Sequence, residues 1–531
     1  MYYNGAGPSS FSQLSHWPAI ILGSGDWTPP HDSDPATRRR LLQAAAGAGL
    51  GVVASPFILR AAGAQSWAAG DPFSLGVASG APRPDGFVLW TRLAPEPLSP
   101  NPQTPGGMRG GDVTVGYEIA TDSALRDVVR RGEATAEQAF AYSVHLDVRG
   151  LQPDRPYWYR FTSGEASSRI GRAATLPSAD ATPERVRFAF ASCANYEHGY
   201  FSAYRHLADE NPEFVLFLGD YIYETIEQKR PTVRRHSDEI EAATLPTYRN
   251  RYAQYRLDAD LQRLHAEVPA YVTWDDHEVS NDYGDKWSER FDDPQMFLMR
   301  RAAAYQAFYE HMPVRPILSL PNGPIMRLYD RFEVGDLIEV SMIDGRQYRS
   351  RQACYKPPFT GGMHLESDAS CPERREAGRT MMGFAQEAWL ASGLAHTKAK
   401  WNLIAQDVLM AQYPSGRTTH SSSRPTIGTA FRQTARASLS ASRRRRCQIR
   451  SCSAATSIRS SPTTCGLIST IRSRRSWPPN SSAPRSRPTG RRTSSSRRRC
   501  LTIPMSISSR VGGAVMFVSI SSARICRCRC G

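Results

Sequence analysis

Short apolar runs that end in polar, ligand-type side chains are the main pattern in the middle of the chain. Residues 214–218 are all apolar, and Gly219 and Asp220 follow directly. Such a run is typical of a strand buried on both faces of a parallel sheet, where chemistry lies beyond the carboxyl end of the strand. Two further runs, at 186–191 and 271–274, also end in ligand-type side chains, in Ser-Cys-Ala-Asn and in Asp-Asp-His-Glu. The sequence therefore predicts three strand ends that meet at one sheet edge.

The chain before and after residue 180 shows two different periodicities. Between 70 and 180, apolar and polar residues alternate in short runs separated by Gly/Pro turns, which predicts a small β-sandwich. Residues 150–153 look like a fibronectin type III element. Between 183 and 412, apolar runs alternate with helical segments, expected at 245–267, 293–311 and 383–399. The predicted fold class is α/β, a sandwich of mixed sheets flanked by helices, preceded by a fibronectin III/Ig-like β-sandwich.

The first 64 residues are expected to lie outside the folded domains. Residues 1–36 are polar and Pro-rich, which predicts a disordered lead. Residues 37–64 combine three arginines at 38–40, a mildly apolar run and an A-x-A site at 62–64, which is typical of a twin-arginine signal peptide. A membrane anchor is the alternative, but the run is short and rich in Gly and Ala. We expect export by the twin-arginine translocation machinery to the periplasm or beyond, without stable membrane insertion.

The basic charge of the chain is concentrated in its last part. A formal charge of +16 would suggest a nucleic-acid partner if it were evenly spread. Residues 413–531 contain 24 Arg and no Lys, Asp or Glu, which leaves 42 basic and 50 acidic residues in 1–412, a net charge of −8. The tail is rich in Ser, Arg and Pro, a composition that predicts disorder. An Arg-rich nucleic-acid-binding protein is therefore an alternative that rests on the tail alone.

Only three of the ten cysteines precede residue 413. Cys354 and Cys371 flank a Gly/Pro-rich loop and either form a disulfide, if the compartment is oxidising, or remain two unpaired loop thiols. Cys193 follows the apolar run at 186–191 and is either a metal thiolate or a buried thiol.

The three strand ends carry different motifs, S-C at 192–193, G-D-x-x-Y at 219–223 and W-D-D-H-E at 274–278. In this order they resemble the alkaline phosphatase D (PhoD-like) family of the metallophosphatase superfamily. The resemblance covers roughly residues 70–412 and implies a metallophosphatase-like catalytic domain at 183–412. It also implies a dinuclear centre, described with Fe³⁺ and Ca²⁺, that acts on phosphate monoesters and diesters. Phosphodiesterase or phospholipase D-type activity on the same fold is the alternative that these motifs do not separate.

The resemblance and the side-chain chemistry together suggest a role for each motif residue. Asp220 can offer one oxygen to each of two metals, and Tyr223 and Cys193 are ligands suited to a ferric ion. Asp276 is expected to bind the second metal. His277 is expected to face the phosphate and to assist the leaving oxygen as a general acid, while a hydroxide between the metals attacks phosphorus in line. The structural alternatives are a buried thiol for Cys193, a core phenol for Tyr223 and an ordinary structural histidine for His277.

Four further polar residues have two interpretations each. Asn195 and Asn281 either bind phosphate or metal, or simply make turns. Arg346 follows a predicted strand at 337–343 and is either a phosphate clamp or a member of an ordinary salt bridge. Asp275 is expected to cap a helix or to support the ligands from behind.

The C-terminal part departs from the family pattern. The family closes its metal shell with Gly-Asp-x-His on one more strand, and residues 413–531 contain no such motif. When residues 449–458 are back-translated into G/C-rich codons, the neighbouring frame can give Asn-Pro-Val-Val-Leu-Gly-Gly-Asp-Ile-His. The same shift gives family-like segments at 429–436 and 476–481. We therefore predict a frameshift between about 412 and 428, which leaves the chain without its last metal-binding histidine and impaired in activity.

Overall fold

The computed structural model describes residues 67, 70–99, 101–228, 230–354 and 371–408, together with the short segments 413–414, 423–424, 449–453 and 515–521. All of these residues lie in one compact unit, 63–531. The predicted lead at 1–36 and the predicted signal peptide at 37–64 lie outside the described residues.

The N-terminal region is a β-sandwich, as its alternating pattern predicts. One layer contains β1 (Val77–Arg83), β2 (Gly86–Arg92) and β5 (Ser143–Val148). The other contains β3 (Val113–Ala120), β4 (Val128–Ala136), β6 (Pro156–Ser163), β7 (Ala166–Ser167) and β8 (Gly171–Ala174). The Tyr157 hydroxyl accepts a hydrogen bond from the Gln152 amide at 3.0 Å, which fixes the turn at 150–153 against β6.

The three apolar runs form parallel neighbours in one sheet. They are β9 (Arg185–Ala191), β10 (Phe214–Leu218) and β11 (Ala270–Thr273), and every residue of β10 is buried. A parallel pairing between Gly80 and Ala270 joins β11 to β1, so that the sheet continues into the sandwich. The resulting sheet has seven strands in the order β18-β9-β10-β11-β1-β2-β5.

A second sheet packs on the first. It has the order β12-β13-β14-β17, with bounds Asp330–Val334, Ile338–Met342, Trp401–Gln406 and Ile449–Ser453. Strands β13, β14 and β17 run parallel. An apolar core between the sheets includes Phe188, Leu216 and Tyr271 on one side and Val340 and Leu403 on the other.

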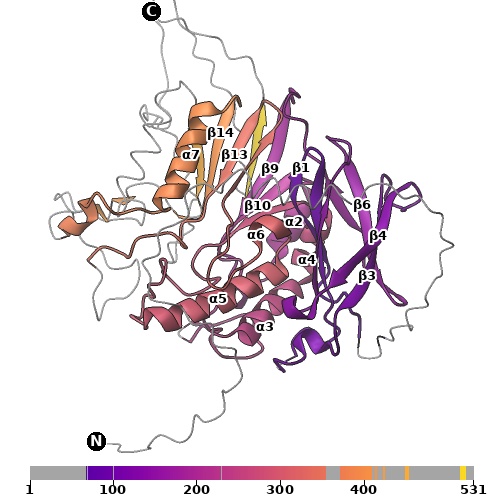
Figure 1. Ribbon diagram of the computed structural model, residues 1–531, viewed down its shortest axis with the longest axis horizontal. Coiled ribbons are helices and arrows are strands. Elements are labelled where there is room, and N and C mark those ends of the chain that lie inside the picture. Colours follow the sequence, from indigo (N-terminus) through magenta and orange to yellow (C-terminus); the bar gives the residue numbers. More distant parts are fainter. Residues whose placement is uncertain are drawn as a thin grey trace, which may run out of the picture. The chain divides into compact units, whose positions relative to one another are not determined.

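Helices cover the outer faces of both sheets (Figure 1). The helices α2 (Ser202–Asp209), α3 (Leu245–Arg256), α4 (Ala259–Glu267) and α5 (Pro294–His311) pack on β9–β11. The helix α7 (Phe384–His396) packs on the second sheet through Leu390 and Leu394. The remaining short elements are α6 (Pro316–Ser319) and the 3₁₀ turns Pro105–Gly107, Gln138–Phe140, Tyr196–His198 and Pro372–Arg375. The predicted α/β fold class is confirmed.

One predicted helix, 245–267, is wrong as a single element. The structure divides it into α3 and α4 at Leu257 and Asp258. The Asp258 carboxylate accepts hydrogen bonds from the amides of Asp260 and Leu261, which starts a new helix. The apolar period continues across the break, so periodicity alone does not reveal it.

The tail differs in part from the expected unpacked chain. Strand β17 pairs in parallel with β14, and β18 (Val515–Ser521) pairs antiparallel with β9. The short strands β15 (Tyr413–Pro414) and β16 (Ser423–Arg424) pair with each other. The other residues of the Arg-rich tail, which carry the nucleic-acid alternative, lie outside the described residues.

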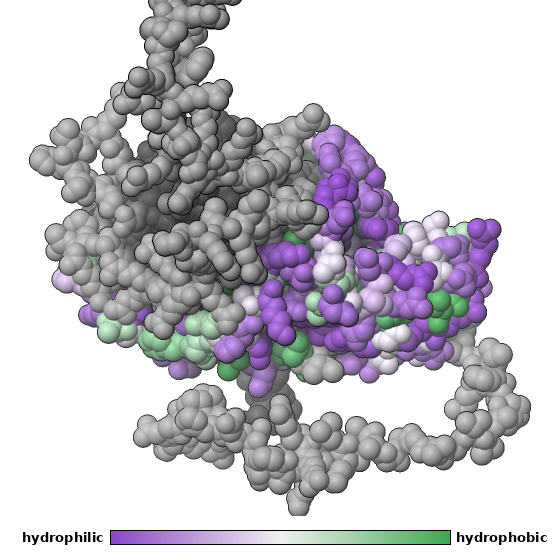
Figure 2. Space-filling model, turned by 90° about the horizontal axis from the view of Figure 1, so that it is seen from above, coloured by the Kyte–Doolittle hydropathy of each residue, from purple (hydrophilic) through white to green (hydrophobic). Residues whose placement is uncertain are grey.

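The face drawn in Figure 2 is mainly hydrophilic over the described residues, with separate hydrophobic patches. Within the described ranges, no helix combines the length and the apolar character needed to cross a bilayer.

Candidate metal centre

The loops that follow β9, β10 and β11 contact one another directly. The amides of Cys193 and Ala194 donate to the carbonyls of Gly219 and Asp220, each at 3.3 Å. Gly219 has φ +86°, and a Cβ at this position would lie 2.3 Å from the Asp275 amide nitrogen. Only glycine permits this conformation and this close approach. The three strand ends therefore meet at one edge, as the sequence predicts.

Two of the candidate ligands have an unusual backbone conformation. Cys193 has φ 58° and Asp220 has φ 51°, both in the left-handed region. Non-glycine residues enter this region at a cost, and such positions cluster at functional sites. The side chains of Cys193 and Asp220 therefore leave the backbone in directions that they would not have in an extended strand end.

Asp220, Asp276 and His277 form a compact buried cluster. One side-chain ligand atom from each of these three residues lies within 4.8 Å of the other two. The Tyr223 hydroxyl donates to Asp220 Oδ2 at 3.1 Å, so the phenol oxygen borders the same group. Cys193 is not part of the three-residue cluster. Burial, and after it the neighbouring Asp220 and Cys193, raise the pKa of Tyr223 well above the ordinary value.

The negative charges of the buried carboxylates in the cluster are only partly compensated by neighbouring cations. Burial raises the pKa of Asp220 well above its ordinary value, and Asp276 and Glu278 add to this although His277 opposes it. For Asp276, burial is outweighed by Arg346 and His277, which lower the pKa. Buried like charges of this kind are stabilised by a bound cation. Carboxylate, phenol and imidazole donors therefore fit a metal ion at this position.

The imidazole of His277 is held by Glu224. His277 Nδ1 lies 2.6 Å from Glu224 Oε2, and Glu224 Oε1 accepts the Asn281 amide at 2.7 Å. The Tyr223 ring packs against the imidazole with centroids 4.2 Å apart. Burial alone would lower the pKa of His277, but the charges of Glu224, Asp220 and Asp276 raise it well above the ordinary value. Sequence reasoning missed Glu224, although it directly follows Tyr223 in the chain.

The two asparagines make mainly structural contacts. The Asn195 side chain accepts from the Glu197 amide at 2.9 Å and caps a 3₁₀ turn. The Asn281 side chain donates to Glu289 at 2.7 Å, and both residues lie in the loop after β11. These hydrogen bonds favour the turn interpretation of both residues.

Asp275 and Glu278 tie the loops together behind the cluster. Arg346 Nε donates to Asp275 Oδ1 at 2.6 Å. The Glu278 carboxylate accepts the Tyr221 amide at 2.6 Å and the Asp275 amide at 2.9 Å, which links the turns after β10 and β11. Burial raises the pKa of Glu278 to about 7. Asp275 therefore lies where an acceptor that supports the ligands from behind is expected.

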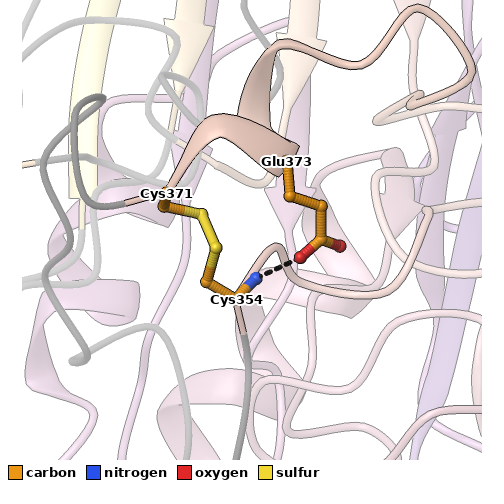
Figure 3. Close-up of side chains that lie close together, drawn as sticks. All are labelled: Cys354, Cys371 and Glu373. Carbon is orange, nitrogen blue, oxygen red and sulfur yellow. Dashed lines mark hydrogen bonds between the residues drawn. A yellow bond between two sulfur atoms is a disulfide. The ribbon is translucent and has the colours of Figure 1, made fainter.

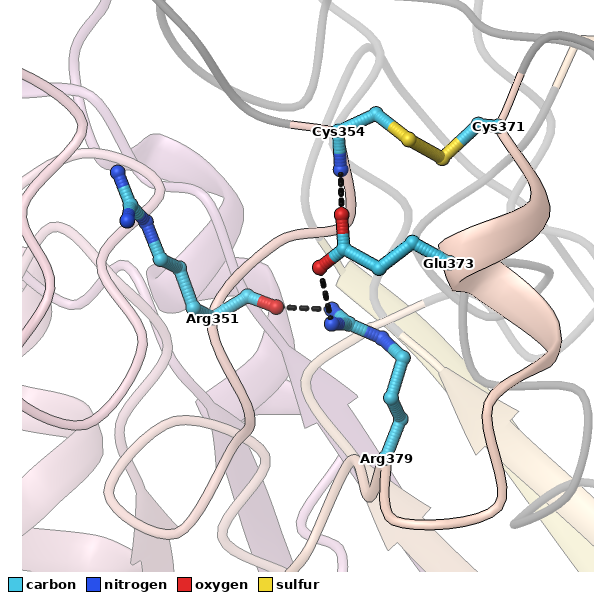
Figure 4. The surroundings of a disulfide bond; sticks show 5 residues. All are labelled: Arg351, Cys354, Cys371, Glu373 and Arg379. Atoms are coloured by element: carbon cyan, nitrogen blue, oxygen red, sulfur yellow. Dashed lines mark hydrogen bonds and ion pairs between the residues drawn. A yellow bond between two sulfur atoms is a disulfide. The ribbon is translucent and has the colours of Figure 1, made fainter.

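Of the two alternatives for Cys354 and Cys371, the structure shows the disulfide, with an S–S distance of 2.07 Å. Glu373 Oε2 accepts the Cys354 amide at 2.6 Å beside it (Figure 3). Arg379 bonds the other Glu373 oxygen at 2.6 Å and also donates to the Arg351 carbonyl (Figure 4). Because the two sulfurs are bonded to each other, this group is a covalent clasp of the loop base and offers no thiolate to a metal.

Two family models match this chain. Residues 188–456 match the family model "PhoD-like phosphatase", and residues 60–177 match "PhoD-like phosphatase, N-terminal domain". The chain belongs to the PhoD-like phosphatase family.

Two individual relatives can be named. Alkaline phosphatase D of Bacillus subtilis (strain 168) is 47% identical over 352 residues, which are 65% of this chain and 57% of that protein. The alignment thus spans less than two thirds of that relative. A solved "Structure of PhoD" matches with a TM-score of 0.65 and 43% identity, over 70% of this chain and 69% of the other.

Proposed function

We propose that this chain is an exported, metal-dependent phosphoesterase of the alkaline phosphatase D type that hydrolyses phosphate monoesters or diesters. The observation that carries the proposal is the buried cluster of Asp220, Asp276 and His277 at the meeting point of three strand ends. Its occurrence in a member of the PhoD-like family links this geometry to phosphate ester chemistry.

Cys193, Asp220, Tyr223 and Asp276 would hold two metal ions, with Fe³⁺ and Ca²⁺ implied by the family resemblance. Thiolate and phenolate suit a ferric ion, while carboxylate oxygens suit calcium. When bound, the metals would polarise the phosphoryl oxygens and supply hydroxide as the nucleophile.

His277 would act on the leaving group. Because Nδ1 donates to the Glu224 carboxylate, the protonated imidazole carries its second proton on Nε2, which is available to the leaving oxygen. Glu224 keeps the ring in this orientation, and the Tyr223 ring limits its tilt. The roles of Asn195, Asn281 and Arg346 in phosphate or metal binding are not needed for this mechanism.

The disulfide supports export, because such bonds persist in oxidising compartments. We propose that residues 37–64 direct the folded protein through the twin-arginine machinery to the periplasm or the exterior. A reporter fused to this segment should be exported, and replacement of the three arginines at 38–40 by lysine should stop it. Unchanged export of the lysine variant would refute the assignment.

We also propose the frameshift between about 412 and 428. The printed residues 449–453 form β17, which pairs with β14 in parallel, and the neighbouring frame gives the apolar run Asn-Pro-Val-Val-Leu at this same place. A chain leaving such a strand emerges at the edge that carries the candidate ligands, where Gly-Asp-x-His would be useful. Resequencing of the gene decides the question, because an uninterrupted frame through the Arg-rich tail would exclude the shift.

The activity is tested with p-nitrophenyl phosphate and bis(p-nitrophenyl) phosphate on the chain with its frame restored. Hydrolysis should disappear with a chelator and in the Asp220→Asn variant, and the ratio of the two rates shows whether monoesters or diesters are preferred. Hydrolysis that survives both treatments would rule out a metal centre at Asp220.

A further inference from the structure

Arg346 is enclosed by carboxylates from two loops, those after β11 and β14. It follows β13, its side chain is 2% exposed, and its nitrogens lie 2.6 Å from Asp275 Oδ1 and 3.5 Å from Asp276 Oδ2. Asp282 and Asp407, in the loops after β11 and β14, lie at 3.7 and 3.9 Å. The guanidinium thus connects the first sheet to the second directly behind the candidate metal centre.

These contacts disfavour the phosphate-clamp interpretation. A clamp must present its fork of N–H groups to the substrate. The nitrogens of Arg346 are instead directed at carboxylates and at the Tyr283 carbonyl, which is 3.3 Å from Nη1. A phosphate group would have to displace one of these buried ion pairs in order to bind.

The contacts on Asp276 show what Arg346 does. Asp276 Oδ2 accepts the Asp282 amide at 2.6 Å and faces Arg346 at 3.5 Å. Both partners lie on the same oxygen, so they hold the carboxylate from one side. The rotation that remains available to Asp276 is small, and Oδ1 stays on the side of His277, whose amide is 3.1 Å away.

We propose that Arg346 is a positioning residue, which orients Asp276 toward the metal and neutralises the surrounding carboxylates without contacting substrate. The inference rests on the proposed function, since it assumes a metal at the cluster. Without the Arg346 guanidinium, four closely spaced carboxylates, three of them buried, would repel one another and Asp276 would lose its fixed direction. Supporting partners of metal ligands typically contribute about 10–100-fold in affinity.

The test is a Mn²⁺ titration of the full-length chain with its frame restored, which serves as the wild type, and of its Arg346→Lys variant. Lysine keeps the charge but not the planar fork, so we expect Mn²⁺ binding to weaken by about 10–100-fold. Arg249→Lys is the matched control, because Arg249 is also buried and bonds Glu310 through two hydrogen bonds of 2.6 and 2.7 Å away from the cluster. Its Mn²⁺ affinity should stay within about twofold of the wild type.

A second variant guards against loss of fold. Asp275 is the nearest ion-pair partner of Arg346, at 2.6 Å. Asp275→Asn keeps the shape of this side chain but removes its charge, and it should weaken Mn²⁺ binding by a few fold. Near-UV circular dichroism checks folding of each sample.

Three outcomes would overturn the inference. Unchanged Mn²⁺ affinity in both variants, together with weaker binding of inorganic phosphate in Arg346→Lys, would restore the clamp. Equal losses in Arg346→Lys and Arg249→Lys would indicate a merely structural role. A wild-type chain that binds no Mn²⁺ would refute the proposed function itself, and the inference with it.

Discussion

The hydrogen bond between His277 Nδ1 and Glu224, at 2.6 Å, is the residue-scale contact on which the proposed acid catalysis depends. Both groups are buried, so water cannot replace the carboxylate if it is removed. The orientation of the ring and the availability of its Nε2 proton then rest on a single partner.

Replacing Glu224 with Gln should therefore slow poor leaving groups most. In the chain with its frame restored, we expect hydrolysis of an alkyl phosphate to fall by about 100-fold, and that of p-nitrophenyl phosphate much less, because a good leaving group does not need a proton. Glu289→Gln, in the loop after β11 that also carries His277, is the control and should affect both substrates alike. Equal losses on both substrates in Glu224→Gln would argue against His277 as the acid.

The sequence predicts which side chains lie close together where a side chain directly follows a buried strand, and their roles as ligands or acid stay predictions. Asp220, Tyr223, Asp276 and His277 lie together because parallel strands share an edge. Glu224 was missed because its role depends on a partner 53 residues away in the chain, which no local pattern specifies.

The turn after β10 is the element that allows the three loops to approach one another. Gly219→Ala would place a Cβ 2.3 Å from the Asp275 amide at a positive φ, so the turn must move. We expect a loss of at least about 2 kcal/mol in the free energy of unfolding and a loss of metal binding. Gly199→Ala, where a Cβ meets nothing within 4 Å, is the control for denaturant unfolding. Equal stability of the two variants would mean that the close approach is not required.

The disulfide is a second element whose contribution can be measured. Cys354 and Cys371 are 17 positions apart, so their bond restricts a loop of moderate length in the unfolded chain. Cys354→Ser with Cys371→Ser should lower the free energy of unfolding by about 3 kcal/mol, measured by denaturant titration. Reductant should destabilise the wild type but not this double variant, and a wild type insensitive to reductant would contradict the expectation.

At the scale of elements, buried strands were predicted well and helix boundaries less well. The apolar runs at 186–191 and 214–218 correspond to β9 and β10 because both faces of these strands are covered. Strand β4 was not predicted, because its inward positions carry Gly132 and Ala134 between charged residues and give no apolar alternation.

The whole molecule buries several neutral histidines, which makes its stability depend on pH. Burial, together with Arg251 and Arg234, lowers the pKa of His236 to about 3, although Glu197 lies 3.5 Å from Nδ1. Burial also lowers the pKa of His145 to about 4. Such residues accept a proton in the unfolded chain before they do so in the folded chain. Their stabilisation is present above about pH 6.5 and is lost as the pH falls toward the folded pKa.

We therefore expect the denaturant midpoint to fall between pH 7 and pH 5. Each such histidine contributes up to about 2 kcal/mol of this loss. His236→Phe keeps the ring that stacks on Tyr196 and Tyr255 but cannot be protonated, so its midpoint should fall less over the same range. A wild-type midpoint that does not change from pH 7 to pH 5 would disagree with this account.

The metal centre is tested most directly by the metal content of the purified full-length chain with its frame restored, after incubation with iron and calcium salts and desalting. Mass spectrometry of the metals should find them in the wild type and in Asp336→Asn, which alters only a surface ion pair with Lys400. The Asp220→Asn variant should lose most of this metal. Equal metal content in the wild type and Asp220→Asn, or no bound metal in any of the three proteins, would contradict the account.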